Sequence, residues 1–354
     1  MDRIRTLLAS LVARLRDIAI AAAAGLLSAP AVANPPCPSD IDGSNTVDFG
    51  DVALILIDFG ACAGCATDLD STGAVDHGDV ALALLEFGLC ATWFTVLEET
   101  PDPAVVYDAG LCAAITTTGL PWRVRDNGTG IEMVLIPPGT YTRGCSASNS
   151  YGCNSDESPT HQVTLTQAFY LSRTEVTQAQ WVAKIGSNPS SFQGDTSRPV
   201  EQVSWNDIQP FCTATGMRLP TEAEWEYAYR AGTTTAFHGW PANPNGTNDD
   251  NQLGTIAWFG SNSSSPTRPV SGKAANGFGL YDMAGNVWEW CQDWYGTYAS
   301  GAQTNPTGPG SGGYRVLRGG SWVIFSGRCR ASFRYIFTPV TRGSHIGFRV
   351  ARTP

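Results

Sequence analysis

Residues 37 to 90 contain an internal repeat of 28 residues, and this repeat limits the possible folds more than any other feature of the sequence. Each copy carries oxygen-bearing side chains at positions 1, 3, 5, 9 and 12 of a twelve-residue loop, which bind Ca²⁺ together with a backbone carbonyl at position 7. Without a cation, each pair of carboxylates about 4 Å apart would repel by about 1–4 kcal/mol. We therefore predict two calcium sites, formed by Asp40, Asp42, Ser44, Thr46, Asp48 and Asp51 in the first copy and by Asp68, Asp70, Thr72, Ala74, Asp76 and Asp79 in the second.

The apolar stretches after the two loops, 52–59 and 80–87, are predicted to form helices. Asn45 replaces the glycine of the usual calcium loop, and Asp replaces the last Glu. Asp at this last position is typical of dockerins, and the paired loop–helix units resemble dockerin repeats. The resemblance implies that 34–91 is a small α-helical, EF-hand-like pair that docks to a partner protein. Two solvated acidic turns are the alternative.

Cysteines bracket each copy of the repeat at equal separation. We predict one disulfide within each copy, Cys37 with Cys62 and Cys65 with Cys90, each worth about 3 kcal/mol in the chain-entropy model. A redox pair formed by Cys62 and Cys65, or a zinc site on the same thiols, is the less favoured alternative because the repeat already explains both residues.

The first 33 residues have the pattern of a signal peptide: an arginine-bearing start, a short apolar core and the small residues Ala31 and Ala33 before the cleavage point. A retained membrane anchor is the alternative. No later segment approaches about 20 apolar residues, so we expect a mature chain without a membrane span, secreted, periplasmic or at the cell surface. The net charge of −10 argues against a nucleic-acid partner, because phosphate binding draws on surplus Lys and Arg.

Residues 92–129 have no sustained periodicity and are predicted to be a linker, with one short strand near 105–107. From residue 130 the chain becomes rich in aromatics, Gly and Pro. Capping boxes that begin at Thr177, Ser204 and Thr221 predict three helices, which end at Gly186, Gly216 and Gly232. Short strands are predicted at 133–136, 162–165, 169–172, 315–317 and 347–351.

Several motifs in this region occur in a fixed order and resemble those of the formylglycine-generating enzyme (sulfatase-modifying factor) family. The resemblance covers 130–354 and implies an α+β, C-type-lectin-like fold with little regular secondary structure. The motifs are Met133-Val-Leu-Ile-Pro-Pro-Gly139, Glu175-Val-Thr177, Pro199-Val-Glu-Gln-Val-Ser-Trp205, Arg218-Leu-Pro-Thr-Glu-Ala-Glu-Trp225, Gly279-Leu-Tyr-Asp-Met-Ala-Gly-Asn-Val-Trp-Glu-Trp290, Arg318-Gly-Gly-Ser-Trp322 and Gly347-Phe-Arg349.

Members of this family oxidise a cysteine of a substrate protein to formylglycine, using O₂ and a copper ion held by two thiolates. Counted from Trp322, the two thiolate positions fall on Ile324 and Cys329, but counted back from Gly347 even Cys329 is about three residues out of register with the family pattern. Copper(I) selects soft sulfur ligands, so copper is not expected here. We instead predict a disulfide between Cys329 and Cys291, which follows Trp290, with a redox-active Cys329 as the alternative. The resemblance has further implications for the substrate groove. It places Ser321 and Trp288 in the substrate groove, although core packing explains Trp288 equally well.

The resemblance also implies a calcium ion held by Asp282, Gly285, Val287 and Glu289, of which the glycine and valine supply carbonyl oxygens. In the alternative, Glu289 caps backbone amides. Cys145 and Cys153 enclose a short loop and are predicted to pair, whereas Cys112 and Cys212 either join the linker to the domain or leave Cys212 as a buried thiol.

These predictions favour a calcium-stabilised binding or scaffold protein that takes a protein or glycan ligand. The competing hypothesis is an active oxidase that forms formylglycine or a related metal-dependent oxidoreductase. The four histidines lack the spacing of a metal site, which argues against relatives that use histidine-bound iron.

Overall fold

The computed structural model describes residues 46–47, 60–61, 74–75, 80, 88–89, 93–146 and 151–354. The chain divides into two compact units, 1–93 and 94–354, which we describe separately. The predicted signal peptide and the predicted disulfides of the repeats lie outside the described residues. So do the predicted calcium ligands of the two loops, except that the backbones of Thr46 and Ala74 are placed in strands.

In the first unit, four short strands preserve the symmetry of the repeat. Strand β1 (Thr46–Val47) pairs with β4 (Gly88–Leu89), and β2 (Gly60–Ala61) pairs with β3 (Ala74–Val75), both antiparallel. The 28-residue shift maps the first ladder onto the second, so each predicted loop pairs with the segment that follows the apolar stretch of the other copy. The repeat is therefore a repeat of structure as well as of sequence.

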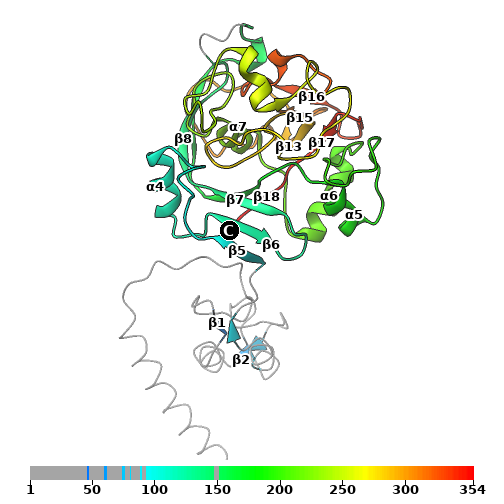
Figure 1. Cartoon of the computed structure of the whole chain (residues 1–354). Helices are drawn as coiled ribbons and strands as arrows, with labels where there is room; N and C mark the ends of the chain where they lie inside the picture. The colour runs from blue at the N-terminus through cyan, green and yellow to red at the C-terminus, as the bar shows by residue number, and fades with distance from the viewer. Residues whose placement is uncertain are drawn as a thin grey trace, which may run out of the picture. The chain divides into compact units, whose positions relative to one another are not determined.

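The second unit contains an antiparallel sheet with the order β18-β10-β7-β6-β5 (Figure 1). Its strands are β5 (Phe94–Glu98), β6 (Arg123–Asp126), β7 (Glu132–Ile136), β10 (Phe169–Ser172) and β18 (Ala351–Arg352). The segment predicted to be a linker thus supplies two strands of this sheet. It also supplies helix α4 (Ala109–Thr117), and a turn replaces the strand expected near 105–107.

The structure confirms the three helices predicted from capping boxes. Helices α5 (Gln178–Ile185), α6 (Trp205–Thr215) and α7 (Glu222–Arg230) begin after Thr177, Ser204 and Thr221, and each of these side chains accepts a hydrogen bond from the backbone three residues later. Gly186 and Gly216 take the left-handed conformation that ends the first two helices. In the third, Ala231 takes it one residue earlier than predicted, with a φ of 43°.

A second sheet has the order β16-β15-β13-β17, and α7 packs against β13 and β15 (Figure 1). Its strands are β13 (Trp288–Trp294), β15 (Arg315–Arg318), β16 (Tyr335–Phe337) and β17 (Ile346–Gly347). The strand predicted over 347–351 is therefore wrong, because the chain leaves β13 after Gly347 and joins β10 only at Ala351.

Three smaller pieces complete the described part of the unit. Strands β8 (Gly139–Arg143), β9 (His161–Leu165) and β14 (Gln303–Thr304) form one sheet, and β11 (Ala257–Trp258) pairs with β12 (Ala284–Gly285). The short 3₁₀ helices are η1 (Ser155–Glu157), η2 (Asp250–Thr255) and η3 (Ser326–Arg328).

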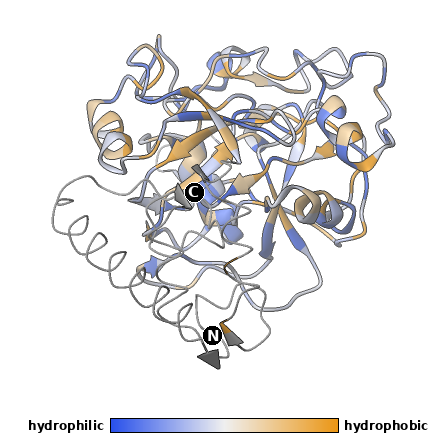
Figure 2. Ribbon diagram, turned by 90° about the horizontal axis from the view of Figure 1, so that it is seen from below, coloured by the Kyte–Doolittle hydropathy of each residue, from blue (hydrophilic) through white to orange (hydrophobic). Residues whose placement is uncertain are grey.

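The core lies between the sheets and the helices that cover them, and it is built largely from aromatic side chains. Trp122, Trp225, Trp288 and Trp290 are among its largest fully buried members. In Figure 2 the central strands carry much of the hydrophobic colour, whereas the connecting segments are mostly hydrophilic. Within the described residues, every helix is too short or too polar to cross a membrane. The mixed α and β content with few helices confirms the α+β class predicted for this unit, whereas the α-helical repeat pair predicted for 34–91 stays a prediction.

Candidate functional site

A pocket of about 670 Å³ lies between η2 with the segment that follows it and residues 323–326. We call it the Ile324 pocket. Its two walls are joined by a hydrogen bond of 2.8 Å from the Gly260 N–H to the carbonyl of Ile324. The lining residues are Asp250, Asn251, Gly254, Phe259, Gly260, Ser261, Asn262, Val323, Ile324, Phe325 and Ser326.

Ile324 and Ser326 both line this pocket, and both are partly exposed. Ile324 is the first thiolate position of the family, counted from Trp322. Ser326 lies three residues before Cys329 and is the second thiolate position when the count runs back from Gly347. The Ser326 hydroxyl donates to Asp250 Oδ2 over 3.0 Å, and the Tyr151 hydroxyl contacts the same two side chains. The pocket thus presents an aliphatic side chain and a hydrogen-bonded hydroxyl at these positions.

Cys329 does not line the Ile324 pocket. Its side chain is fully buried, and burial raises the pKa of its thiol to about 12, although the backbone N–H groups of Ser321 and Gly285 oppose the shift. Gly320 has a φ of 81°, and a Cβ there would lie only 2.5 Å from the Cys329 sulfur, so this turn packs directly on the thiol. A neutral thiol sealed beneath a turn is poorly placed to act as a nucleophile or a metal ligand.

The predicted disulfide between Cys291 and Cys329 is wrong, because both residues are free buried thiols. Cys112 and Cys212 are also free, so they do not join the former linker to the domain, and Cys212 is the buried thiol of the alternative prediction. The disulfide between Cys145 and Cys153 is confirmed, with a Cα–Cα distance of 5.6 Å. The short sequence spacing thus predicted the disulfide between Cys145 and Cys153 correctly. Cys291 and Cys329 lie far apart in the sequence, and spacing gave no guide to whether they are bonded.

Ser321 and Trp288, the other two predicted groove residues, are buried and do not line the Ile324 pocket. Trp288 stacks on Tyr335 with ring centroids 5.1 Å apart, which supports the core-packing alternative. The hydroxyl of Ser321 is buried without a hydrogen-bond partner among the described residues. The sequence missed Asp250 and Phe325, because no motif marks them and only the fold brings them into one pocket.

The loop predicted to bind calcium contains the residues Asp282, Gly285 and Asn286, all with positive φ. Asp282 Oδ2 accepts a hydrogen bond of 2.6 Å from the Ser271 N–H, whereas Oδ1 is buried with no partner among the described residues. Burial raises the pKa of Asp282 to about 6. A buried carboxylate oxygen of this kind is available to a cation.

Glu289 does not cap backbone amides. Its Oε2 accepts from Arg349 Nε over 2.6 Å and from Trp225 Nε1 over 2.6 Å, and its Oε1 accepts from Arg349 Nη2 over 2.7 Å, so only Oε1 has room for a further ligand. Asp282 and Glu289 both raise the pKa of buried Glu175, and burial is the larger cause. The buried carboxyl groups of Glu175, Asp282 and Glu289 thus have one guanidinium, that of Arg349, among the charges that act on Glu175. A divalent cation at the predicted loop would supply the missing positive charge.

No group of three or more His, Cys, Asp or Glu side chains in the described ranges is arranged to hold a metal ion. The predicted loop site does not require such a group, because two of its four ligands are backbone carbonyls. The ligands of the predicted site are therefore Asp282, the Oε1 atom of Glu289 and the backbone carbonyls of Gly285 and Val287.

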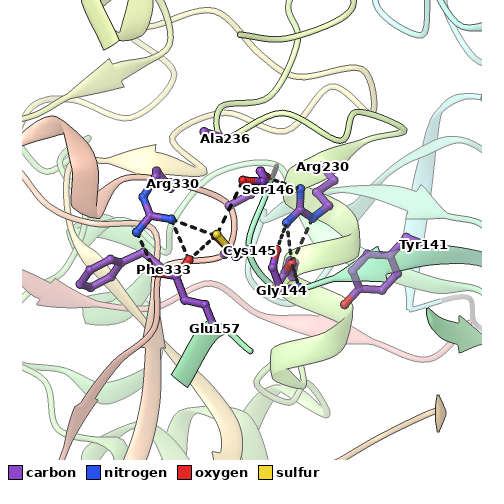
Figure 3. Close-up of polar contacts among 12 residues, drawn as sticks. Tyr141, Gly144, Cys145, Ser146, Glu157, Arg230, Ala236, Arg330 and Phe333 are labelled. Carbon is purple, nitrogen blue, oxygen red and sulfur yellow. Dashed lines mark hydrogen bonds and ion pairs between the residues drawn. The ribbon is translucent and has the colours of Figure 1, made fainter. Parts of the chain in front are cut away.

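Buried ion pairs hold the scaffold around these sites. Glu226, Arg230 and Arg318 form one cluster, and Glu157 forms a bidentate pair with Arg330 at 2.7 Å. Figure 3 shows Arg330 directed at Glu157 and Arg230 directed at the backbone of Gly144 and the hydroxyl of Ser146, on either side of Cys145. These contacts tie the disulfide-bearing loop to α7.

The sequence matches curated formylglycine-generating enzymes. Over 189 residues it is 40% identical to a formylglycine-generating enzyme of Thermomonospora curvata, a match that covers 50% of this chain and 62% of the relative. Over 200 residues it is 37% identical to the formylglycine-generating enzyme of Mus musculus, covering 54% and 53%. The chain thus spans between about half and two thirds of the length of these curated relatives.

Two solved structures share the fold. Variable protein 1 of Treponema denticola aligns with a TM-score of 0.55 at 32% identity, covering 63% of this chain and 95% of that one. PvdO from Pseudomonas aeruginosa aligns with a TM-score of 0.56 at 28% identity, covering 66% and 98%. The model of the sulfatase-modifying factor enzyme 1-like domain matches residues 121–354. Because this match spans well over half of the sequence, the chain belongs to the formylglycine-generating enzyme (sulfatase-modifying factor) family.

Proposed function

We propose that this chain is a non-catalytic member of its family and that the Ile324 pocket binds a short segment of a partner polypeptide. The observation that carries the proposal is the presence of Ile324 and Ser326 at the two thiolate positions of the pocket. Cys329, which is the second thiolate position when the count starts from Trp322, is buried and does not line the pocket. Isoleucine and serine offer copper(I) no soft ligand.

The surface chemistry of the pocket suits a polypeptide. Val323 and Phe325 are 52% and 55% exposed and stand in the wall of the pocket, where large apolar side chains in contact with water mark interaction sites. Asn262, Asp250 and exposed backbone supply hydrogen-bonding groups in the same lining. A volume of about 670 Å³ is within the usual range for ligand pockets. The fold itself does not fix the function, since one fold hosts many sites.

A peptide library displayed on phage tests this proposal. We expect peptides selected on the wild-type protein to lose binding when Phe325 is replaced by Ser, by about tenfold or more, because an exposed aromatic anchor supplies much of such an affinity. Val340→Ser is the matched control, since Val340 is 66% exposed and does not line the pocket. Selected peptides that bind Phe325→Ser and the wild type equally would contradict the proposed site.

For the first unit, we propose that the two acidic loops bind calcium and that the repeat pair docks to a partner protein in the manner of dockerins. The support is the spacing of oxygen-bearing residues and the matching of the two ladders under the 28-residue shift. The signal-like pattern of residues 1–33 supports export of the chain. Export would also suit the disulfide between Cys145 and Cys153.

We also propose that the second unit binds calcium at Asp282, Gly285, Val287 and Glu289. When bound there, the ion would neutralise the excess of buried carboxylates. Ten of the eleven tryptophans lie in this unit, and the remaining one, Trp93, lies outside the acidic loops, so tryptophan fluorescence mainly follows the melting of this unit without a direct signal from the loops. We expect a calcium chelator to lower the melting temperature measured in this way, and we expect Asp282→Asn to abolish most of the difference between calcium and chelator. An unchanged difference in Asp282→Asn would refute this assignment.

A further inference from the structure

A second pocket of about 390 Å³ shares no lining residue with the Ile324 pocket. We call it the Asp293 pocket. Strands β8, β9 and β13, helix α7 and the segment 296–309 contribute to its walls. Its chemistry-bearing residues are Arg143, His161, Glu222, Asp293, Tyr298 and Arg334.

Two lining side chains of this pocket hold buried polar atoms with no hydrogen-bond partner among the described residues: Asp293 Oδ1, and Nε and Nη2 of Arg143, of which Nη2 is ion-paired with Glu222. The two side chains belong to residues only 2% and 4% exposed. Buried polar atoms are nearly always hydrogen-bonded, and each one left unpaired costs about 1–3 kcal/mol. An unpaired acceptor and an unpaired donor in one pocket therefore point to a group that the protein itself does not supply.

The remaining contacts of these residues fix their orientation. Asp293 Oδ2 accepts a hydrogen bond of 2.8 Å from the Glu222 N–H at the start of α7, which leaves Oδ1 for another partner. The guanidinium of Arg143 lies over the ring of Tyr298 at 4.4 Å, and its Nη2 is 2.7 Å from Glu222 Oε2. Burial raises the pKa of Asp293 to about 7, and nearby Arg143 opposes the shift. Contacts with Glu222 and Tyr298 thus fix both side chains in the wall of the same pocket.

The charge of the lining narrows the class of ligand. When Asp293 is ionised, the guanidiniums of Arg143 and Arg334 balance the carboxylates of Glu222 and Asp293. An anionic ligand would accept a hydrogen bond from Arg143 but would place a second acceptor against the Asp293 carboxylate. An ammonium group would donate to Asp293 but would place a second donor against Arg143. A hydroxyl group both donates and accepts, so a single hydroxyl can satisfy both atoms without adding charge. The lining also includes Trp294, Pro306 and Pro309, which suit the C–H face of a ring.

We propose that the Asp293 pocket binds a neutral hydroxylated ring, of the kind found in a monosaccharide unit, with one hydroxyl between Arg143 Nε and Asp293 Oδ1. This site is independent of the peptide site proposed for the Ile324 pocket. Its ligand can therefore be gained or lost without any change in peptide binding.

The test uses the full chain and a panel of small probes, with saturation-transfer NMR as the readout. The neutral probes are methyl glucoside, methyl mannoside, methyl galactoside and N-acetylglucosamine, and the charged probes are glucosamine and glucuronate. We expect at least one neutral probe to bind saturably, with a dissociation constant of about 1 mM for a ligand of this size, and the charged probes to bind at least about tenfold more weakly.

Two variants locate the binding. Arg143→Lys keeps the charge but removes the Nε donor, and Thr307→Trp fills the mouth of the pocket from an exposed position that leaves the core intact. Both should weaken binding by at least about tenfold, whereas Val340→Ser should leave it unchanged. The proposal is overturned if no neutral probe binds saturably, if charged probes bind as well as neutral ones, or if Thr307→Trp binds like the wild type.

Discussion

Glu226→Gln is expected to lower the free energy of unfolding by about 3–5 kcal/mol, because it leaves buried guanidiniums without their counter-charge. The carboxylate of Glu226 is fully buried and accepts from Arg230 Nε over 3.0 Å, from Arg230 Nη2 over 2.8 Å and from the Gly144 N–H over 2.9 Å. It also pairs with Arg318, whose guanidinium is buried among the carbonyls of 331–333. For a unit of this size, the loss corresponds to about 10 °C in melting temperature.

Glu132→Gln is the matched control for this prediction. Glu132 also contacts two arginines, Arg125 at 2.8 Å and Arg173 at 2.9 Å, but its side chain is 30% exposed, and exposed pairs contribute at most about 1 kcal/mol. Melting followed by tryptophan fluorescence compares the two variants. Equal losses of stability would show that burial of the Glu226 cluster does not have the energetic role that we assign to it.

Ile324→Cys combined with Ser326→Cys is expected to create a copper(I) site in a pocket whose wild-type lining contains no sulfur. Both residues line the same pocket, and two thiolates supply the soft ligands that copper(I) prefers. Because wild-type binding should be negligible, the expected effect on affinity is large. Copper(I) titration against a competing chelator under anaerobic conditions measures it.

The single variants serve as controls and test the register of the second thiolate position. Ile324→Cys alone should bind copper(I) far more weakly than the double variant, because Ser326 remains beside it and Cys329 is sealed under the Gly320 turn. If Ile324→Cys alone matched the double variant, Cys329 would be reachable as the second ligand. That result would contradict the placement of Ser326 in the thiolate position.

Local sequence signals predicted the elements that depend on local contacts. The capping boxes at Thr177, Ser204 and Thr221 satisfy amides within a single turn, so they located three helices. The same holds for the disulfide between Cys145 and Cys153, which closes a short loop. The motif around Trp322 also drew attention to Ile324, which the structure places in the lining of a pocket.

Features that depend on distant pairing were not visible in the sequence. Strand β5 pairs with β6, and β6 pairs with β7. Because these strands are stabilised by pairing with other segments and lack a periodic pattern of their own, the sequence alone made them look like a linker. The segment 347–351 looks like one strand but serves two sheets. Asp250 and Ser326 lie 76 residues apart in the chain, so only the fold could bring them together in one pocket.

The most direct test of the non-catalytic assignment is the amount of copper bound by the wild-type protein, together with its turnover of a Cys-x-Pro-x-Arg peptide in air after anaerobic loading with copper(I). We expect no bound copper above the level of a blank and no aldehyde on the peptide, because the Ile324 pocket offers no pair of thiolates. One copper ion per chain with formation of formylglycine would contradict the account and establish the oxidase instead.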